Sequence, residues 1–329
     1  MTQNPETPTQ DSQQTQGTQR TQATRVLVTG GLGFIGSNLV PALRERRHEV
    51  WVCDLGHSEG PNYIRCDVSK YRQLEKIFEQ HDFDYVYHLA AEYGRWNGED
   101  YYENLWLTNV VGTKNLIRLQ EKKRFRMIFF SSAEVYGDYG GVMSEDVMDK
   151  VPIKQMNDYA TAKWAGELQV LNSAVMFSTE TVRVRPVNAY GPHEYYSPYR
   201  GVIPAFIYKA LRDEPYTVYL GHKRIFDYAE DTCRTFANIV DNFKPGEVYN
   251  VGSKEEWEHE IKYVSDLILK CLGKGDSRVI YKEAEPFTTR VKHMDFSKAR
   301  RDLDHDPKVP LEEGIPRTIE WMKKVYGFK

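Results

Sequence analysis

Three glycines, Gly30, Gly33 and Gly36, lie between a short β-branched run (RVLVTG) and a stretch with the apolar spacing of a helix (SNLVPALRER). In such a turn the first glycine permits a tight bend, the second lets the backbone approach a pyrophosphate, and the third allows a helix to pack closely on a strand. The amino end of the helix also attracts an anion. The pattern predicts a dinucleotide-binding turn, although three glycines alone also fit an ordinary tight turn.

An acidic residue, Asp54, ends the next predicted strand, 18 residues after Gly36 (54 − 36). A carboxylate at this position accepts hydrogen bonds from the ribose hydroxyls of adenosine and repels the 2′-phosphate of NADP. We therefore predict that the cofactor is NAD.

Tyr159 and Lys163 are four residues apart at the start of a predicted helix, so the phenol and the ammonium lie on one face. A nearby cation and the positive charge of a nicotinamide would lower the pKa of the phenol, which could then act as a base towards a sugar hydroxyl. The same spacing alone also fits a half-exposed aromatic residue beside a solvated lysine.

A further polar segment, Ser131 to Gly137 (SSAEVYG), follows a predicted strand. Ligands of an open α/β sheet lie at the carboxyl ends of its strands. The hydroxyl of Ser132 could share a substrate proton with Tyr159, and the carboxylate of Glu134 could move a proton bound to carbon or oxygen. The alternative for Glu134 is a surface acid in a loop.

Together and in this order, these segments resemble the extended short-chain dehydrogenase/reductase family, and within it the NAD-dependent nucleotide-sugar epimerases and dehydratases. The resemblance runs from Arg25 to near the C-terminus. It rests on VTGGLGFIG, the acid of VCDL, CDV, HLAA, NVVGTKNL, SSAEVYG, YATAK, RPVNAYGP and RIFDYAED.

The resemblance implies a cofactor site, a catalytic set and substrate contacts. The cofactor residues are Gly30, Gly33, Phe34, Ile35, Gly36, Asp54, Asp67, Val68, Leu89, Ala90, Ala91, Asn109, Tyr159 and Lys163. The catalytic set is Ser132, Tyr159 and Lys163, to which the residues themselves add Glu134. Substrate contacts are expected at Tyr93, Ser132, Asn188, Arg200, Arg224 and Arg290, with Asn188 and Arg224 at the nucleotide diphosphate. Arg200 and Arg290 are proposed because a guanidinium pairs with two phosphate oxygens, and each also fits a solvated arginine.

One departure from the family pattern bears on the reaction. Members that remove water from the sugar carry an Asp-Glu pair after the catalytic hydroxyl, whereas this chain has Ala133 before Glu134. Decarboxylating members carry a small hydroxyl residue before the Glu, and simple 4-epimerases usually lack the Glu.

The sequence therefore favours a redox-neutral enzyme that forms a transient 4-keto sugar and epimerises at C4 or C5. The alternatives are a dehydratase or decarboxylase that uses Glu134 and a net NAD-dependent sugar dehydrogenase. A non-catalytic NAD-responsive binding protein is a further reading, against which the intact Ser132, Tyr159 and Lys163 argue.

The elements that position these residues alternate along the chain. Strands are expected at 25–30, 48–55, 84–91, 126–137 and 180–192, and helices at 37–46, 71–80, around 108–120 and at about 159–173. Alternating strands and helices predict an α/β fold, a Rossmann-type doubly wound parallel sheet. We expect an NAD-binding domain at 25–190 and a smaller C-terminal substrate lobe at 191–329, partly interleaved with it. Residues 1–24, rich in Thr and Gln, predict a disordered tail.

Composition excludes several other classes. The 329 residues carry a net charge of −3, so nothing favours a nucleic acid or a membrane surface as the partner. The four scattered cysteines have no metal-ligand spacing and predict reduced thiols in a cytoplasmic protein. We expect no metal, and a homodimer that pairs through helices from about Asn104 and Tyr159, as the family does.

Overall fold

The computed structural model describes residues 23–329, so most of the predicted tail, residues 1–22, lies outside the described part of the chain. Seven parallel strands form the central sheet in the order β11-β6-β5-β4-β1-β2-β3. Their bounds are β1 Arg25–Thr29, β2 Glu49–Asp54, β3 Tyr63–Arg65, β4 Tyr85–His88, β5 Arg126–Phe130, β6 Thr181–Pro186 and β11 Val248–Val251. The strand order reverses between β1 and β4, which opens a crevice at their carboxyl ends.

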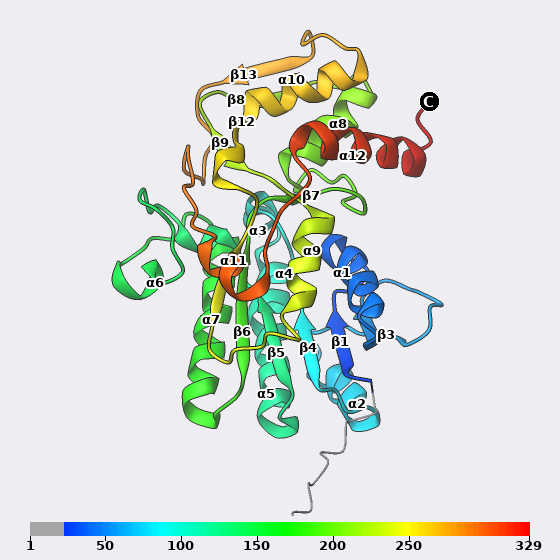
Figure 1. Ribbon diagram of the computed structural model, residues 1–329, viewed down its shortest axis with the longest axis vertical. Coiled ribbons are helices and arrows are strands. Elements are labelled where there is room, and N and C mark those ends of the chain that lie inside the picture. Colours follow the sequence, from blue (N-terminus) through cyan, green and yellow to red (C-terminus); the bar gives the residue numbers. More distant parts are fainter. Residues whose placement is uncertain (1–22) are drawn as a thin grey trace, which may run out of the picture.

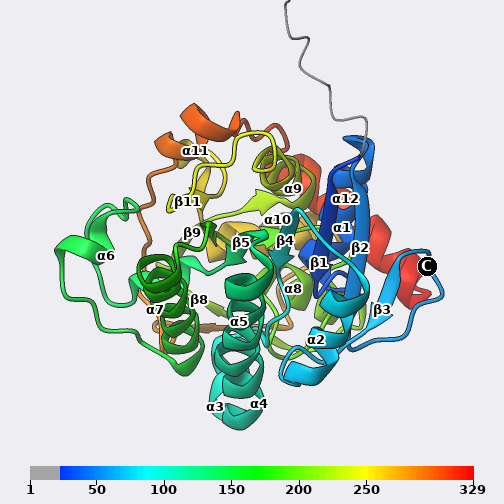
Figure 2. The same ribbon diagram turned by 90° about the horizontal axis from the view of Figure 1, so that it is seen from below.

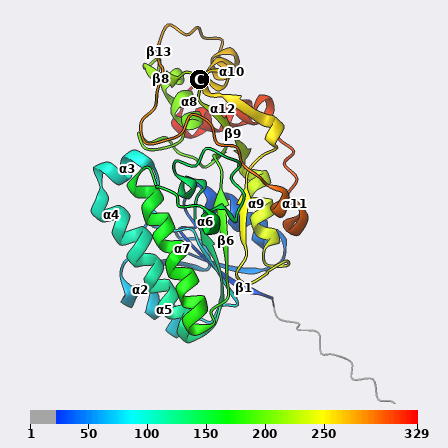
Figure 3. The same ribbon diagram turned by 90° about the vertical axis from the view of Figure 1, so that its left-hand side faces the viewer.

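Helices cover both faces of this sheet, as Figures 2 and 3 show. One face carries α1 (Phe34–Glu45), α9 (Ala229–Asn238) and α11 (Ser297–Leu303). The other carries α2 (Tyr71–Gln80), α5 (Thr113–Lys123) and α7 (Asp158–Phe177). Alternate residues of β1 serve the two layers: Val26 and Val28 join the cluster with α1 and α9, and Leu27 joins the cluster with α2 and α5. The predicted Rossmann-type α/β fold is confirmed.

The C-terminal part of the chain forms a smaller lobe above the carboxyl ends of the strands (Figure 1). It has its own apolar cluster between α8 (Val202–Leu211), α10 (Ile261–Leu272) and α12 (Leu311–Tyr326). Short pairs complete it: β8 (Tyr216–Tyr219) with β13 (Val279–Lys282), β9 (Lys223–Ile225) with β12 (Glu258–Glu260), and β7 (Ala189–Tyr190) with β10 (Asp227–Tyr228). The chain returns from this lobe to the main sheet through α9, β11 and α11.

The segments between strands and helices differ from the expected pattern in two places. The strand predicted at 126–137 ends at Phe130, and residues 133–136 form a 3-10 turn, η2, before the short α6 (Val147–Lys150). The helix expected around 108–120 is a longer rod of α4 (Tyr102–Trp106), a π-helical turn, η1 (Leu107–Gly112), and α5. The short α3 (Arg95–Asp100) precedes this rod, and a second 3-10 turn, η3 (Glu255–Trp257), leads into β12.

A buried carboxylate fixes α7 to the central strands. Glu167 is fully buried and accepts hydrogen bonds from Arg185 on β6, Nε to Oε1 at 2.8 Å and NH2 to Oε2 at 2.8 Å. It also accepts bonds from Arg183 on β6 at 3.0 Å and from the hydroxyl of Ser131, next to β5, at 2.5 Å. These contacts hold one position of α7 opposite two neighbouring strands.

Two further features of the described residues bear on function. Within residues 23–329, every helix is too short or too polar to cross a membrane. The same residues contain no group of three or more His, Cys, Asp or Glu side chains that could hold a metal ion.

Substitution of Glu167 by Gln is expected to destabilise the fold strongly, because Arg183 and Arg185 then share a buried site without a counter-charge. Removing one partner of a buried pair costs about 3–5 kcal/mol. Chemical denaturation measures the loss. The control is Glu180→Gln, which breaks the exposed pair with Arg126 and should cost about 0–1 kcal/mol. Equal losses for the two variants would contradict this role for Glu167.

Candidate active site

A cavity of about 610 Å³ lies between the carboxyl ends of the strands and the C-terminal lobe. It gathers most of the residues that the sequence predicted for the site. Those that line it are Gly30, Gly33, Phe34, Ile35, Gly36, Asp54, Asp67, Val68, Leu89, Ala90, Ala91, Tyr93, Ser132, Glu134, Tyr159, Lys163, Asn188, Arg200 and Arg224. Asn109 and Arg290 do not line it. One cavity therefore adjoins the glycine turn, the Tyr159–Lys163 end of α7 and the C-terminal lobe.

The glycine turn between β1 and α1 can be made only without side chains. Gly30 has φ +70°, and a Cβ there would lie 2.7 Å from the backbone of Ala90. A Cβ on Gly36 would lie 2.5 Å from the Cα of Gly31. Gly33 precedes the first turn of α1, which no side chain caps, so free backbone N–H groups face the cavity. This open helix end fits a pyrophosphate.

Asp54, the last residue of β2, is hydrogen-bonded to the glycine turn. Oδ2 of Asp54 accepts a hydrogen bond from the backbone N–H of Leu32 at 3.0 Å, and Oδ1 accepts one from Gly56 at 3.2 Å. These bonds fix the carboxylate at the rim of the cavity and leave lone pairs for ribose hydroxyls. Asp67 lies nearby and accepts a bond from the N–H of Ser69 at 2.9 Å. This end of the cavity fits the adenosine half of NAD.

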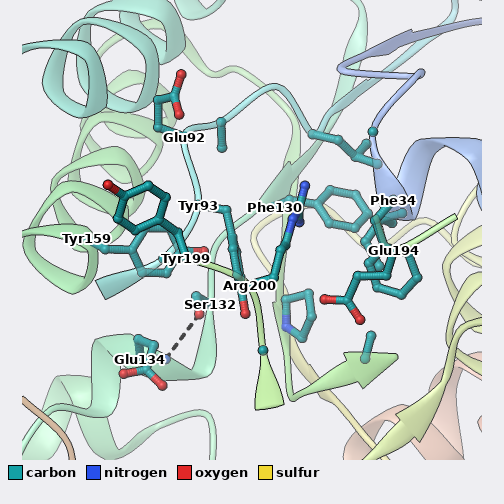
Figure 4. Close-up of a pocket in the computed structure, with 18 of the residues that line it drawn as sticks. Phe34, Glu92, Tyr93, Phe130, Ser132, Glu134, Tyr159, Glu194, Tyr199 and Arg200 are labelled. Carbon is teal, nitrogen blue, oxygen red and sulfur yellow. Dashed lines mark hydrogen bonds between the residues drawn. The ribbon is translucent and has the colours of Figure 1, made fainter. Parts of the chain in front are cut away.

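Tyr159 and Lys163 enter the cavity from the first turns of α7. Asn157 caps this helix by accepting a hydrogen bond from the N–H of Ala160 at 2.8 Å, which sets where the helix begins. Both side chains are about 5% exposed. The ring of Tyr159 packs edge-on against that of Tyr93, with centroids 5.7 Å apart. Figure 4 shows these two rings beside Ser132, whose hydroxyl accepts a bond from the N–H of Glu134 at 3.2 Å.

In the protein alone, burial raises the pKa of the Tyr159 phenol above its usual range, and the neighbouring Tyr93 adds to this effect. A hydrogen bond with Ser132 and the charge of Arg200 lower this pKa but only partly offset the burial. Burial also lowers the pKa of Lys163 to about 7. The Lys163 ammonium donates a hydrogen bond to the carbonyl of Phe130 at 2.9 Å, and its Nζ lies 5.9 Å from the centre of the Tyr159 ring. The lysine is therefore close to the phenol but directed at the backbone.

Glu134 has a partner that sequence reasoning missed. Lys292, 4% exposed and 158 residues further along the chain, donates a hydrogen bond to Oε1 of Glu134 at 2.5 Å. Burial by itself raises the pKa of Glu134, but Lys292, Arg95 and Arg224 outweigh it and hold this pKa at about 2. Glu134 is consequently a firmly ionised carboxylate and a weak base.

Two arginines and a glutamate surround this pair. Arg95, at the start of α3, donates to Glu285 at 2.7 Å. Arg224 on β9 uses its NH1 and NH2 groups as hydrogen-bond donors to the loop at 288–290 and to its own strand. The acceptors, at 2.7–2.9 Å, are Thr288 Oγ1 and the backbone carbonyls of Lys223, Thr289 and Arg290. Arg224 thus fixes the loop that leads to Lys292. It also lines the cavity, as the prediction of a substrate contact requires.

Glu194 is a second carboxyl group in the cavity, and the sequence did not single it out. It is 3% exposed, and its Oε2 has no hydrogen-bond partner among the described residues. Burial raises its pKa to about 8, which the nearby Arg200 only partly offsets. Figure 4 places Arg200 between Glu194 and Tyr93, and the guanidinium carbon of Arg200 lies 5.2 Å from the centre of the Tyr93 ring.

Of three further predicted residues, Asn109 and Arg290 lie outside the cavity lining, and Asn188 lines the cavity while its side chain binds the backbone. Asn109 is buried in η1 and clamps the backbone of Glu92, accepting from its N–H at 2.8 Å and donating to its carbonyl at 2.9 Å. Arg290 is exposed, and its carbonyl accepts from Arg224. Asn188 donates to the carbonyl of Ile225 at 3.0 Å and so ties the segment after β6 to β9. Lys292 lies two residues from Arg290 in a segment without regular structure, so no periodicity indicated which cation faces inwards.

The raised pKa of Glu194 predicts a pH-dependent stability. The folded state binds this proton more tightly than the unfolded chain, whose Glu has an ordinary pKa of 4.5. Stability from Glu194 is therefore present below that pH and is lost as the pH rises through about 8. Thermal unfolding should show Glu194→Gln gaining on the wild type from about pH 4.5 to about pH 8. The exposed Glu283→Gln serves as the control, and parallel curves for wild type and Glu194→Gln would refute the assignment.

Comparisons with known proteins identify the family of this chain. The model of the family described as "NAD dependent epimerase/dehydratase family" matches residues 26–252. A UDP-N-acetyl-alpha-D-glucosaminuronate decarboxylase of Bacillus cytotoxicus is 31% identical over 324 residues, covering 92% of this chain and 98% of the relative.

Solved structures give the same result. An epimerase from Methanothermobacter thermautotrophicus superimposes with a TM-score of 0.84 at 26% identity, covering 93% of this chain and 94% of that one. UDP-glucuronic acid 4-epimerase from Bacillus cereus, solved with UDP-glucuronic acid and NAD, gives 0.81 at 26% identity, covering 92% and 100%. The chain belongs to the NAD dependent epimerase/dehydratase family, and it is an NAD-dependent enzyme.

Proposed function

We propose that this enzyme inverts the configuration at C4 of the sugar in a nucleoside-diphosphate sugar, with no net oxidation or reduction. Once the positive charges of a bound nicotinamide and of Lys163 lower the pKa of its phenol, Tyr159 takes the proton of the C4 hydroxyl, and Ser132 shares that proton from its position beside the ring. Bound NAD supplies a hydride acceptor for C4, which becomes a hydride donor once the C4 ketone has formed. The ketone turns so that its opposite face meets the hydride donor, and Tyr159 then returns the proton to the new hydroxyl oxygen. Two of the relatives named above are epimerases, and they support this proposal.

The observation that carries the choice of C4 is the ion pair between Glu134 and Lys292. Removal of the C5 proton needs a base whose pKa lies near the working pH, and a carboxylate with a pKa of about 2 is poorly suited to this role. Loss of water from C6 also needs an acid for the departing oxygen, and Ala133 offers none. Inversion at C4 needs neither group.

Decarboxylation is the second candidate, because a 4-keto uronate can lose carbon dioxide without a base at C5, and the enolate that remains then takes a proton at C5 from solvent. The decarboxylase relative at 31% identity favours it.

Turnover in deuterated water separates these reactions. Nucleoside-diphosphate sugars carrying UDP, GDP, CDP and dTDP are incubated with the enzyme, and products are analysed by mass spectrometry and NMR. We expect inversion at C4, unchanged mass and no deuterium on carbon. Deuterium at C5 without loss of mass would contradict the proposal in favour of C5 epimerisation. Deuterium at C5 with loss of carbon dioxide would select decarboxylation, and loss of water would select dehydration.

Tyr159→Phe tests the assigned base in the same assay. The change removes only the hydroxyl, so packing is kept while the rate should fall by about 10²–10⁴. Tyr71→Phe, which removes a phenol hydroxyl at the start of α2 and outside the cavity, should leave the rate unchanged. A Tyr159→Phe enzyme with near wild-type turnover would exclude a base role for this residue.

We also propose a homodimer formed by α4, η1 and α7. These helices lie side by side on one face (Figure 3) and expose apolar side chains, among them Leu107 and Val111 on η1 and Leu168 and Val175 on α7. Two-fold pairing would bury this surface. Light scattering at about micromolar concentration should give a dimer, and Leu168→Glu should give a monomer. Val142→Glu, in an exposed loop elsewhere, is the control. A wild-type monomer would overturn the proposal.

A further inference from the structure

Two cation–carboxylate pairs line the part of the cavity next to the catalytic hydroxyl. Lys292 bonds to Glu134 at 2.5 Å, and Arg95 bonds to Glu285 at 2.7 Å. The four side chains come from three segments. Glu134 lies in the turn after β5, Arg95 at the start of α3, and Glu285 and Lys292 in the loop before α11. Each pair is largely removed from solvent, with side chains between 5% and 24% exposed.

Both cations keep donors that no protein group uses. The Lys292 ammonium has three N–H bonds, and Glu134 is its one hydrogen-bonded acceptor among residues 23–329. NH1 of Arg95 is buried and has no partner in the same part of the chain. A ligand that fills this place must offer several acceptor oxygens, because a buried donor left unpaired costs about 1–3 kcal/mol.

The two pairs together with Arg224 carry an excess of one positive charge. Lys292, Arg95 and Arg224 act on Glu134 together, giving three cations against the two carboxylates Glu134 and Glu285. A third carboxylate, Glu258, has a smaller effect and acts on Arg224. Arg224 is bound to its own loop and cannot turn to another acceptor without losing those bonds. A hydroxymethyl group would bring acceptor oxygens but no charge. A carboxylate brings both, and so matches the cluster more closely.

The position of the cluster identifies which part of the substrate it meets. If Ser132 and Tyr159 act on the C4 hydroxyl, groups beside them face the ring atoms next to C4. Glu134, which holds Lys292, bonds through its backbone N–H to Ser132. In a pyranose, C4 is flanked by C3, which carries a neutral hydroxyl, and by C5, which carries the C6 substituent, whereas C1 with the diphosphate lies across the ring. The anion at Lys292 and Arg95 is therefore on C6.

We propose that the substrate is a nucleoside-diphosphate uronate, whose C6 carboxylate is bound by Lys292 and Arg95. This inference rests on the proposed function, since it places a nucleotide sugar with C4 at Ser132 and Tyr159. Glu134 acts here as a positioning residue that holds Lys292 towards the sugar.

Calorimetric titration of the NAD-loaded protein tests the inference. UDP, dTDP, GDP and CDP are compared first, and the nucleotide that binds most tightly is then used as its glucose, galactose, glucuronate and galacturonate. We expect the uronates to bind about tenfold or more tightly than the neutral sugars. Lys292→Met should abolish this preference, and Lys292→Arg should keep part of it. Lys282→Met, which removes an exposed lysine at the end of β13, should change nothing.

Glu134→Gln gives a readout that a merely structural role would not produce. Loss of this carboxylate raises the local excess from one positive charge to two, so the preference for uronates should increase rather than fall. Equal affinity for uronate and neutral sugar, or a uronate preference that survives Lys292→Met, would overturn the inference while leaving the proposed function intact. Failure of every nucleoside diphosphate and sugar to bind would instead contradict the proposed function.

Discussion

The buried contact of Glu167 with Arg183 and Arg185 is the constraint on which the site depends. Glu167 lies on the same helix as Tyr159 and Lys163, at successive spacings of four residues, so a shift of α7 along β6 would move all three together. Its bond to Ser131 ties the helix to the end of β5, where Ser132 follows. The distance between the Tyr159 phenol and the Ser132 hydroxyl is thus set by the buried contact of Glu167 with Arg183 and Arg185, which lies outside the cavity lining.

Two carboxyl groups of the cavity, Glu134 and Glu194, have pKa values shifted in opposite directions. Glu134 is surrounded by cations and stays ionised, with a pKa of about 2. Glu194 has one weak cationic neighbour and no partner for Oε2, and its pKa rises to about 8. Burial acts on both, so the difference comes from Lys292, Arg95 and Arg224. The end of the cavity at Glu134, where cations surround a fixed carboxylate, is suited to an anionic group, whereas Glu194 stays protonated below about pH 8 and adds no negative charge there.

The smaller lobe completes the site because the chain passes between the two parts several times. β11 extends the main sheet beyond β6, and α9 packs on α1. α8, α10 and α12 form the smaller lobe above the carboxyl ends of the strands (Figure 1). Arg224 then holds the 288–290 loop from β9, and this loop leads to Lys292. The residues around the sugar are therefore contributed by segments from Arg95 to Lys292, and their mutual distances depend on how the two parts are joined.

Sequence alone determined the α/β class, the glycine turn, Asp54, the Tyr159–Lys163 face and the Ser132 segment. These features depend on residues a few positions apart, where strand alternation, helical spacing and the steric freedom of glycine leave a readable pattern. Only the tertiary structure decided that Glu134 is paired with Lys292, that Lys163 is directed at the Phe130 carbonyl, and that Glu194 is buried beside Arg200. Those contacts join irregular segments far apart in the chain, and the charge and solvent exposure that set each pKa arise only when the segments pack together.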